Sequence, residues 1–351
     1  MKKIIYISYT RLDYSLNSVY IKGLRQNGAE VLCYKLPSKD IGSHLKALNF
    51  VRDNKKNSDA LIVGYDSSNL AVFLRPFYWK KIIYSAVLPV YERLVFSRGL
   101  ASPFSPKGIY YWLIDCLAFN FSNLIMVESN QQAEYISKSY FVSRKKLFRA
   151  WIGVDDDKFF YDPSIPKLPV FTVVFRGALM PEAGAEYVVQ AAKILEGENI
   201  KFIMQSGGML LDKIEKIKKE LNPKNLELRS DLLPYEELRV LMQKCHLSLG
   251  QLSDHTRLDR TIPHKVYESL IMKLPYLTAS NKGILELVKD GETCLACKPA
   301  NARSLADKIL WAKNNSQELE KIAKNGYEFY TQNLTPQIIA GRLLNKMESP
   351  V

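Results

Sequence analysis

The 351-residue sequence contains few cysteines and histidines, five and four respectively. The cysteines are odd in number and widely spread, which argues against a disulfide framework and favours a reducing environment. Cys294 and Cys297 form the one C-x-x-C pair, and no histidine has the spacing that would complete a zinc set. We therefore expect no metal site at this pair.

Long apolar runs are also scarce. Residues 108–127 have the length of a membrane span, but they include Asp115 and Asn120, and Ser122-Asn123 divides them. We therefore expect a buried helix followed by the buried strand LIMV. The start of the chain leads directly from MKK into the alternating, strand-like IIYISY, so we expect no secretory leader.

Acidic residues are in deficit, with 36 Asp and Glu against 49 Lys and Arg, a net charge of +13. Residues 1–165 hold 23 basic and 14 acidic residues, or +9, which leaves +4 for the rest. Such a surplus indicates a polyanionic partner, which could be nucleic acid, an anionic membrane or a phosphorylated ligand. The first half is the expected contact region.

Short apolar strands alternate with amphipathic helices along most of the chain. This rhythm is interrupted near residues 151–168 and then restarts. It predicts an α/β protein with two doubly wound, Rossmann-like domains and a ligand site in a cleft between them. The expected domains are 1–165 and 166–330, with a helix in 331–351 that returns to the first domain.

The most informative stretch is TIPHKVYESLIMKLPYLTAS, residues 261–280. A helix that begins near Pro263 would point its first amides at a phosphate group. Lys265 in the first turn opposes the helix dipole unless an anion is bound. Glu268 could accept two hydrogen bonds from sugar hydroxyls. The alternative is an ordinary exposed helix that contains a glutamate.

The pattern P-x-K-x-x-E-S-L-x-x-x-x-P, with GILELVKDG at 283–291, resembles family 4 glycosyltransferases, which have the GT-B fold and two domains facing a central cleft. The resemblance is to the subset with P-x-K-x-x-E in place of the full E-x7-E motif. It extends over nearly the whole chain and is firmest in the second half. Further similar stretches are 124–136, 152–159, 173–195, 200–208 and 226–250.

The resemblance implies a donor site with two departures from the family. Glu268 matches the second glutamate of the motif, and Arg260 stands where the first would be. Ala178 and Ala183 occupy the positions of the usual basic pair for the donor diphosphate. We expect Lys265 to be the first residue that neutralises the diphosphate, with Arg176, Arg257 and Arg260 as substitutes. The expected catalytic residues are Lys265, Glu268 and Arg260, and the expected donor-binding residues are Arg176, Gly177, Gly184, Gly207, Arg229, Pro263, His264, Gly283, Ile284 and Glu286.

The expected acceptor side lies in the first half of the chain. Arg11 and Asp13 follow the first strand and either face the site or are solvated loop charges. Tyr84-Ser85 occupies the region where the family has a histidine, and Glu92 and Arg93 follow. The run Asp155-Asp156-Asp157 matches the linker and is interpreted as a solvated turn, so the expected transferase needs no metal.

Residues 75–98 interleave basic and aromatic side chains. A membrane-surface contact, a core strand with charged flanks and, least favoured, a nucleic-acid contact all fit this composition. A second basic cluster, Arg144, Lys145, Lys146 and Arg149, favours the membrane.

The resemblance implies a retaining transferase, and together these features predict that it is a metal-independent hexosyltransferase without a cofactor. Its donor is a nucleoside diphosphate sugar, with UDP favoured over GDP, and its acceptor is a glycan or polyprenyl-linked hydroxyl. We expect it in the cytoplasm at the inner face of the cell membrane, in cell-surface polysaccharide or glycoconjugate synthesis, without nucleic acid as a partner. The alternative is a catalytically silent GT-B protein that binds a glycan or acts as a scaffold.

Overall fold

The computed structural model describes residues 1–348, which form two compact units. Unit 1 comprises Met1–Asp155 and the C-terminal segment from Leu334, and unit 2 comprises Asp156–Asn333. The division thus precedes the expected boundary at residue 165. The reason is that the connecting segment is bonded to unit 2: the Asp162 N–H donates to Gln243 Oε1 at 2.8 Å, and Gln243 Nε2 donates to the Phe160 carbonyl at 3.1 Å.

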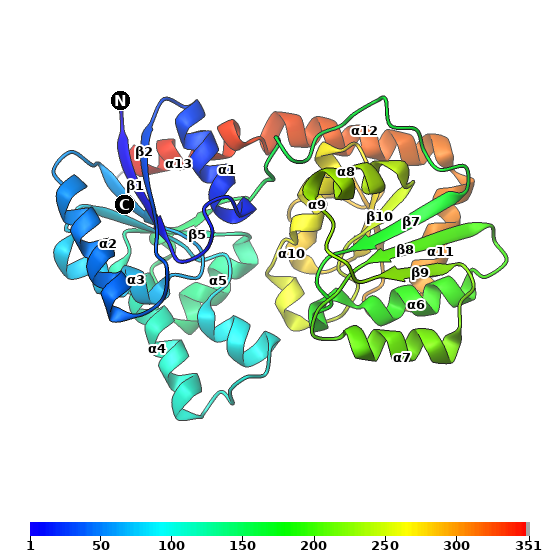
Figure 1. Ribbon diagram of the computed structural model, residues 1–351, viewed down its shortest axis with the longest axis horizontal. Helices are drawn as coiled ribbons and strands as arrows, with labels where there is room; N and C mark the ends of the chain where they lie inside the picture. Colours follow the sequence, from blue (N-terminus) through cyan, green and yellow to red (C-terminus); the bar gives the residue numbers. More distant parts are fainter. Residues whose placement is uncertain (349–351) are drawn as a thin grey trace. The chain divides into compact units, whose positions relative to one another are not determined.

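Unit 1 contains a six-stranded parallel sheet (Figure 1). Its strands are β1 (Lys3–Ser8), β2 (Glu30–Lys35), β3 (Ala60–Val63), β4 (Lys81–Ser85), β5 (Leu124–Val127) and β6 (Leu147–Arg149), in the spatial order β2-β1-β3-β4-β5-β6. Its helices are α1 (Ser15–Gln26), α2 (Ile41–Asn54), α3 (Ser68–Leu74), α4 (Pro106–Phe121), α5 (Asn130–Ser139) and α13 (Pro336–Glu348). Alternate residues of β1 serve opposite faces. Ile4 and Tyr6 pack in the core formed with α1 and α13, and Ile5 and Ile7 in the core formed with α2 to α5.

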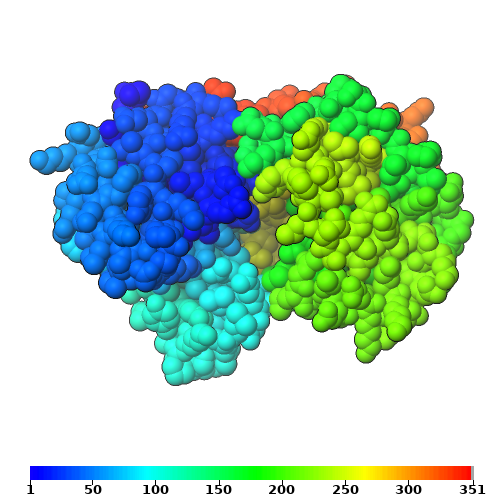
Figure 2. All heavy atoms as spheres, viewed as in Figure 1, coloured from blue at the N-terminus to red at the C-terminus, as the bar shows by residue number. Residues whose placement is uncertain are grey.

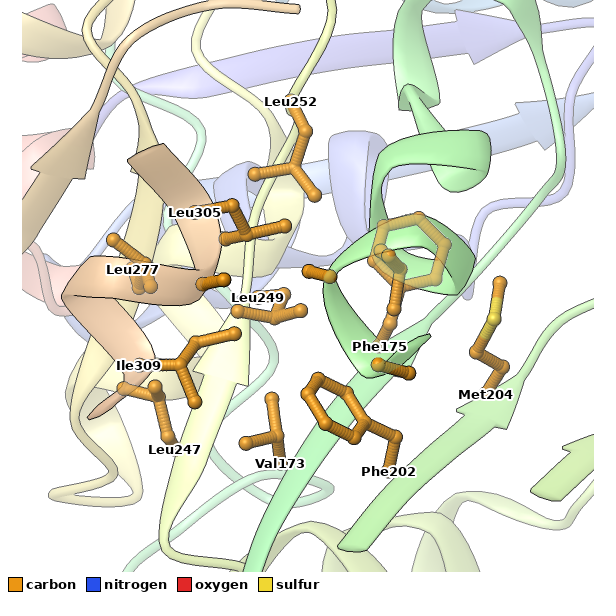
Figure 3. Close-up of a cluster of buried hydrophobic side chains, with 14 of the residues drawn as sticks. Val173, Phe175, Phe202, Met204, Leu247, Leu249, Leu252, Leu277, Leu305 and Ile309 are labelled. Atoms are coloured by element: carbon orange, nitrogen blue, oxygen red, sulfur yellow. The ribbon is translucent and has the colours of Figure 1, made fainter. Parts of the chain in front are cut away.

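Unit 2 contains a second six-stranded parallel sheet. Its strands are β7 (Phe171–Arg176), β8 (Ile200–Gln205), β9 (Leu226–Arg229), β10 (Leu247–Leu249), β11 (Tyr276–Ala279) and β12 (Leu295–Cys297), in the order β12-β11-β10-β7-β8-β9. Its helices are α6 (Ala185–Ile194), α7 (Leu211–Leu221), α8 (Tyr235–Lys244), α9 (His264–Ile271), α10 (Lys282–Leu285), α11 (Ala302–Asn314) and α12 (Ser316–Asn333). Figure 3 shows Leu305 and Ile309 of α11 against Val173 and Leu249 of the sheet. The predicted fold class, two doubly wound Rossmann-like domains, is confirmed.

The last helix, α13, packs on α1 in unit 1. The helices approach so closely that a Cβ atom on Gly23 would lie 1.9 Å from the carbonyl oxygen of Pro336. Asn27, the C-cap of α1, donates from its amide to the carbonyl of Gln337 at 2.8 Å. These contacts attach the C-terminal segment to the first Rossmann-like unit.

Gly23→Ala is expected to lower the stability of unit 1, because backbone atoms of α13 occupy the position of the new methyl group. Overpacking of this kind costs about 1–3 kcal/mol or more. Thermal unfolding measures the loss, with Gln26→Ala, an exposed position of the same helix, as the control. An unchanged unfolding midpoint for Gly23→Ala would show that α13 does not pack on α1 in this way.

The apolar stretch at 108–127 forms α4 and β5, a helix and a strand as the sequence predicts. The strand is buried as expected, but the helix is not fully buried, since Ile109, Tyr110 and Leu113 are exposed. Within residues 1–348, none of the helices combines the length and the apolar character needed to cross a membrane. Asp115 is fully buried in α4, where its carboxylate accepts from the Ser68 hydroxyl at 2.7 Å and from the Tyr91 backbone N–H at 2.8 Å. The carboxylate therefore attaches α4 to α3 and to the segment around Tyr91.

Burial raises the pKa of Asp115 to about 7, and the nearby Asp66 adds to this effect. The folded state therefore holds the proton more tightly than the unfolded chain, in which Asp titrates near ~3.9. Stability must then fall as pH rises from about 4 to about 7 and level off above that range.

Asp115→Asn removes this titration. We expect the urea midpoint of the variant, relative to wild type, to rise between about pH 4 and pH 7 and then stay constant. A difference between the two proteins that does not vary with pH would contradict the raised pKa.

Candidate functional site

The order of strands in unit 2 defines where a ligand can bind. From β7 the chain adds β8 and β9 on one side, then crosses to β10, β11 and β12 on the other. The carboxyl ends of β7 and β10 therefore flank a topological switch point, the usual ligand position in open α/β sheets. At these ends lie Arg176 and Gly177 after β7, and Gly250 and Gln251 after β10.

Helix α9 starts at His264 with Pro263 as its N-cap, as the sequence predicts. Its first turn places Lys265 at the switch point. The Lys265 side chain is buried, and its Nζ lies 3.5 Å from Gln251 Oε1 and 3.7 Å from the centre of the Phe175 ring. A Cβ on Gly177, which has φ 112°, would lie 3.3 Å from Lys265 Cε, so glycine permits this close approach.

Glu268 lies one turn further along α9 and forms an ion pair with Arg176 at the end of β7. Both side chains are largely buried. The pair joins two of the predicted donor-site residues across 92 positions of sequence and holds a guanidinium beside the first turn of α9.

This part of unit 2 has an excess of buried positive charge. Burial lowers the pKa of Lys265 well below its usual range, and the neighbouring Arg176 lowers it further. The same two causes lower the pKa of His264 to about 4, so this imidazole is neutral at pH 7. No carboxylate among residues 1–348 lies within ion-pair distance of Lys265 Nζ. A bound anion would stabilise the charged form of this lysine.

The loop between β7 and α6 carries the two alanines that replace the family's basic pair. Ala178 is exposed, whereas Ala183 is fully buried in the core of unit 2. Gly184 follows with φ 62°, and a Cβ there would lie 2.6 Å from the backbone nitrogen of Ser253. Glycine at 184 therefore allows α6 to begin directly against the segment after β10.

Arg257, predicted as a substitute cation, lies in the 3₁₀ turn Thr256–Asp259 and pairs with the buried Glu182 at 3.2 Å. The pair links this turn to the Gly184 loop. The close approach of Gly283 to the carbonyls of Leu258 and Thr261 in turn fixes α10 against the same segment. Arg257 is therefore engaged in holding the loops around the site.

The other predicted donor residues lie on several different elements of unit 2. Arg229 ends the edge strand β9 and is paired with Glu227 at 2.7 Å, so it is not joined to the Lys265 group. Gly207 accepts from the Leu179 N–H at 2.8 Å and so shapes the loop after β8. Arg260 caps the 3₁₀ turn, and Ile284 is buried in α10, at whose end Glu286 lies.

Sequence reasoning missed three polar residues near the strand ends. Gln251 contacts Lys265. Gln205 ends β8 opposite Arg176, and Ser206 follows it. The Gln205 Oε1 and the Ser206 hydroxyl are buried without a hydrogen-bond partner in the part of the chain that the structure describes. Their position directly after apolar strands was the available signal.

Unit 1 has its own switch point between β1 and β3. Ser8, Thr10 and Asn17 form a hydrogen-bonded group there, with Asn17 Nδ2 donating to Thr10 Oγ1 at 2.8 Å. Asp66, which sequence reasoning also missed, follows β3 in a left-handed conformation with φ 58°. Its carboxylate pairs with Arg93 at 2.5 Å and Lys39 at 3.0 Å, which brings the predicted Arg93 to this strand end.

Several predicted acceptor-side residues are placed where direct contact with a ligand is not available. Tyr84 is fully buried with its hydroxyl 2.7 Å from Ser68 Oγ, and Ser85 and Glu92 are buried as well. Tyr84 and Ser85 are buried because they belong to β4, an interior strand in which residues 82–85 are all buried. Arg11 and Asp13 are exposed and paired with each other, which matches the alternative of solvated loop charges.

Two groups of side chains are candidates for metal ligands, one of carboxylates and one of thiols. Asp155, Asp156 and Asp157 bring carboxylate oxygens within 4.8 Å of one another, and Asp155 is buried rather than fully solvated. Cys294 and Cys297 are buried free thiols, and burial raises the pKa of each to about 12. They are therefore protonated near neutral pH.

The comparisons agree with the resemblance in the second half of the chain. Residues 160–329 match the family model of glycosyl transferases group 1, and this range lies within unit 2. The match covers most of unit 2 and none of the residues before 160. No curated protein sequence matches the chain.

Solved structures show the same two-unit fold, which is the GT-B fold. Anabaena Alr3699/HepE in complex with UDP and glucose is 14% identical, with a TM-score of 0.76 over 100% of both chains. Sucrose-phosphate synthase from Thermosynechococcus elongatus is 14% identical, with a TM-score of 0.78 over 99% of both chains. A glycosyltransferase from Rickettsia africae is 13% identical, with a TM-score of 0.69 over 99% of this chain and 98% of that one.

Proposed function

We propose that this protein is a glycosyltransferase that moves a sugar from a nucleoside diphosphate sugar to a hydroxyl acceptor. The observation that carries the proposal is the buried group of Lys265, Arg176 and Glu268 at the switch point of unit 2, the unit that matches the glycosyl transferases group 1 model. Two cations beside a helix N-terminus suit a diphosphate, and a carboxylate suits sugar hydroxyls.

In this proposal Lys265 and Arg176 neutralise the donor diphosphate in place of the cations that Ala178 and Ala183 do not provide. Charge develops on the diphosphate as the glycosidic bond breaks, so fixed cations there lower the barrier. The first-turn amides of α9 add to this stabilisation. Glu268 accepts hydrogen bonds from the donor ribose. When the donor binds, the Glu268 carboxylate is shared between the ribose hydroxyls and Arg176.

The finer features are proposed on the same basis. Transfer retains the anomeric configuration, needs no metal or cofactor, and uses UDP in preference to GDP; the structure of Anabaena Alr3699/HepE with UDP-glucose supports this choice of donor. The acceptor is a glycan or polyprenyl-linked hydroxyl, contacted from unit 1 near Asp66 and Arg93. The product belongs to cell-surface polysaccharide or glycoconjugate synthesis.

The test is hydrolysis or transfer with a panel of UDP-, GDP- and dTDP-sugars, with and without EDTA. We expect that only one of the three nucleoside diphosphates is released and that EDTA does not affect its release. We also expect an α-linked product from an α-linked donor. A product of inverted configuration, or loss of activity with EDTA, would overturn the corresponding feature.

A catalytically silent protein is the second candidate, favoured by Ala178 and Ala183 and by the Arg176–Glu268 pair, which occupies the carboxylate. It predicts that donors raise the unfolding temperature without any turnover across the panel. Absence of both binding and turnover would reject both candidates.

A further inference from the structure

Helix α4 exposes an apolar face. Ile109, Tyr110 and Leu113 are 54%, 51% and 46% exposed and lie on one side of the helix, because residues three or four apart share a face. The opposite side, with Asp115 and Phe119, is buried in unit 1. A helix that is apolar all round is normally covered on both sides. The outer face of α4 therefore calls for a partner.

The segment before α4 adds to this surface. Phe96 lies in the π-helical turn Glu92–Ser97, and Leu100 and Phe104 follow in the loop; Phe104 is 90% exposed. The loop is held against α4, since a Cβ on Gly108 would lie 2.2 Å from the carbonyl oxygen of Ser102. We call residues 94–121 the α4 lobe; Figure 2 shows this part of unit 1, coloured cyan to teal, protruding from the unit.

The charges of the α4 lobe have one sign at its surface. Arg98 and Lys107 are exposed, and the one carboxyl group between residues 94 and 121, Asp115, is buried. At the other end of α4, Lys146 Nζ donates to the Asn120 carbonyl at 2.7 Å, beside the exposed Arg144 and Lys145. The apolar face thus lies between two groups of cations.

We propose that the α4 lobe is a docking surface for an anionic lipid bilayer. Its Phe, Tyr, Leu and Ile side chains enter the headgroup and upper acyl region, and the cations at both ends meet lipid phosphates. The proposal concerns binding to the bilayer alone and does not depend on the transfer reaction. It moves the membrane contact from residues 75–98, where β4 is buried, to the α4 lobe, which shares only residues 94–98 with that range.

Charge argues against a second copy of this chain as the occupant. A symmetric pair through α4 would bring Arg98 and Lys107 of both copies together, with no exposed carboxylate of the lobe to offset them. An anionic bilayer supplies the opposite charge over the whole surface.

The test is co-sedimentation of the full-length protein, without donor, with vesicles of phosphatidylcholine alone or mixed with phosphatidylglycerol. Wild type should bind the anionic vesicles, and added salt should weaken binding. Phe104→Ser/Ile109→Ser/Leu113→Ser should weaken it at least about tenfold, because three apolar side chains no longer insert. Arg98→Ser/Lys107→Ser should weaken binding to anionic vesicles about tenfold.

Two matched variants complete the design. Leu232→Ser removes an equally exposed apolar residue of unit 2, and Trp79→Ser removes the most exposed aromatic residue of 75–98; both should bind like wild type. All substituted side chains are exposed, so folding is expected to be retained. The proposal is overturned if wild type ignores anionic vesicles, if the triple variant binds normally, or if the triple substitution converts a dimer into a monomer without any vesicle binding.

Discussion

Replacing Lys265 by alanine is expected to lower kcat/KM for the nucleotide sugar by about 10²–10³, the cost of removing one preorganised charge from a developing anion. Turnover should suffer more than donor KM, because charge on the diphosphate increases as the bond to the sugar breaks. Initial rates over a range of donor concentrations separate the two constants. We expect the Lys265→Ala protein to remain folded. Burial lowers the pKa of the Lys265 side chain because it disfavours the charged form, so the folded protein does not depend on this charge.

The control for this variant is Lys289→Ala, an exposed lysine of the same unit. It should have the kinetics and unfolding temperature of wild type. Full turnover in Lys265→Ala would remove the lysine from the reaction and leave Arg176 as the principal cation of the proposal.

Replacing Glu268 by alanine is expected to raise the donor KM by about 10–100-fold, because the ribose loses a charged hydrogen-bond acceptor. The substitution also leaves the Arg176 guanidinium buried without this carboxylate, which costs about 3–5 kcal/mol when a buried pair is broken on one side. The KM must therefore be measured beside thermal unfolding, so that lost binding is distinguished from lost structure.

Arg176→Ala/Glu268→Ala tests the stability part of this expectation, and its donor KM also includes the loss of the Arg176 contact with the diphosphate. Removal of both partners should restore much of the stability while the donor KM stays high. Glu236→Ala, at the exposed start of α8, is the matched single control. An unchanged donor KM in folded Glu268→Ala protein would reject the ribose contact.

Local pattern was sufficient for the elements that carry the site. The alternation of apolar strands and helices predicted both sheets, and Pro263 correctly marked the start of α9. The division of 108–127 into α4 and β5 followed from a charge and two polar residues that interrupt the run. Such features depend on neighbouring residues, which a sequence displays directly.

Long-range side-chain pairing was not available from pattern. Arg257 was predicted as a substitute cation for the diphosphate and is held by Glu182, and Glu268 was predicted as a sugar ligand without its partner Arg176. Tyr84 was assigned to a ligand surface, but its hydroxyl bonds Ser68 inside the core. Asp66 was missed because a single aspartate after a short strand does not by itself indicate a site. Its importance appears only in the structure, where it pairs with Arg93 and Lys39.

The proposed membrane contact differs from the predicted one for a related reason. Composition drew attention to 75–98, yet β4 within that range is an interior strand. Exposure, which composition does not report, assigns the apolar surface to the α4 lobe.

The most direct test of the central claim, that unit 2 binds a nucleoside diphosphate at its switch point, is calorimetric titration of UDP into wild type, Lys265→Ala and Arg229→Ala. We predict one UDP per chain for wild type, at least about tenfold weaker binding for Lys265→Ala, and unchanged affinity for Arg229→Ala, whose side chain is paired with Glu227 on the edge strand. Equal affinity in wild type and Lys265→Ala, or loss of binding in Arg229→Ala alone, would contradict the account.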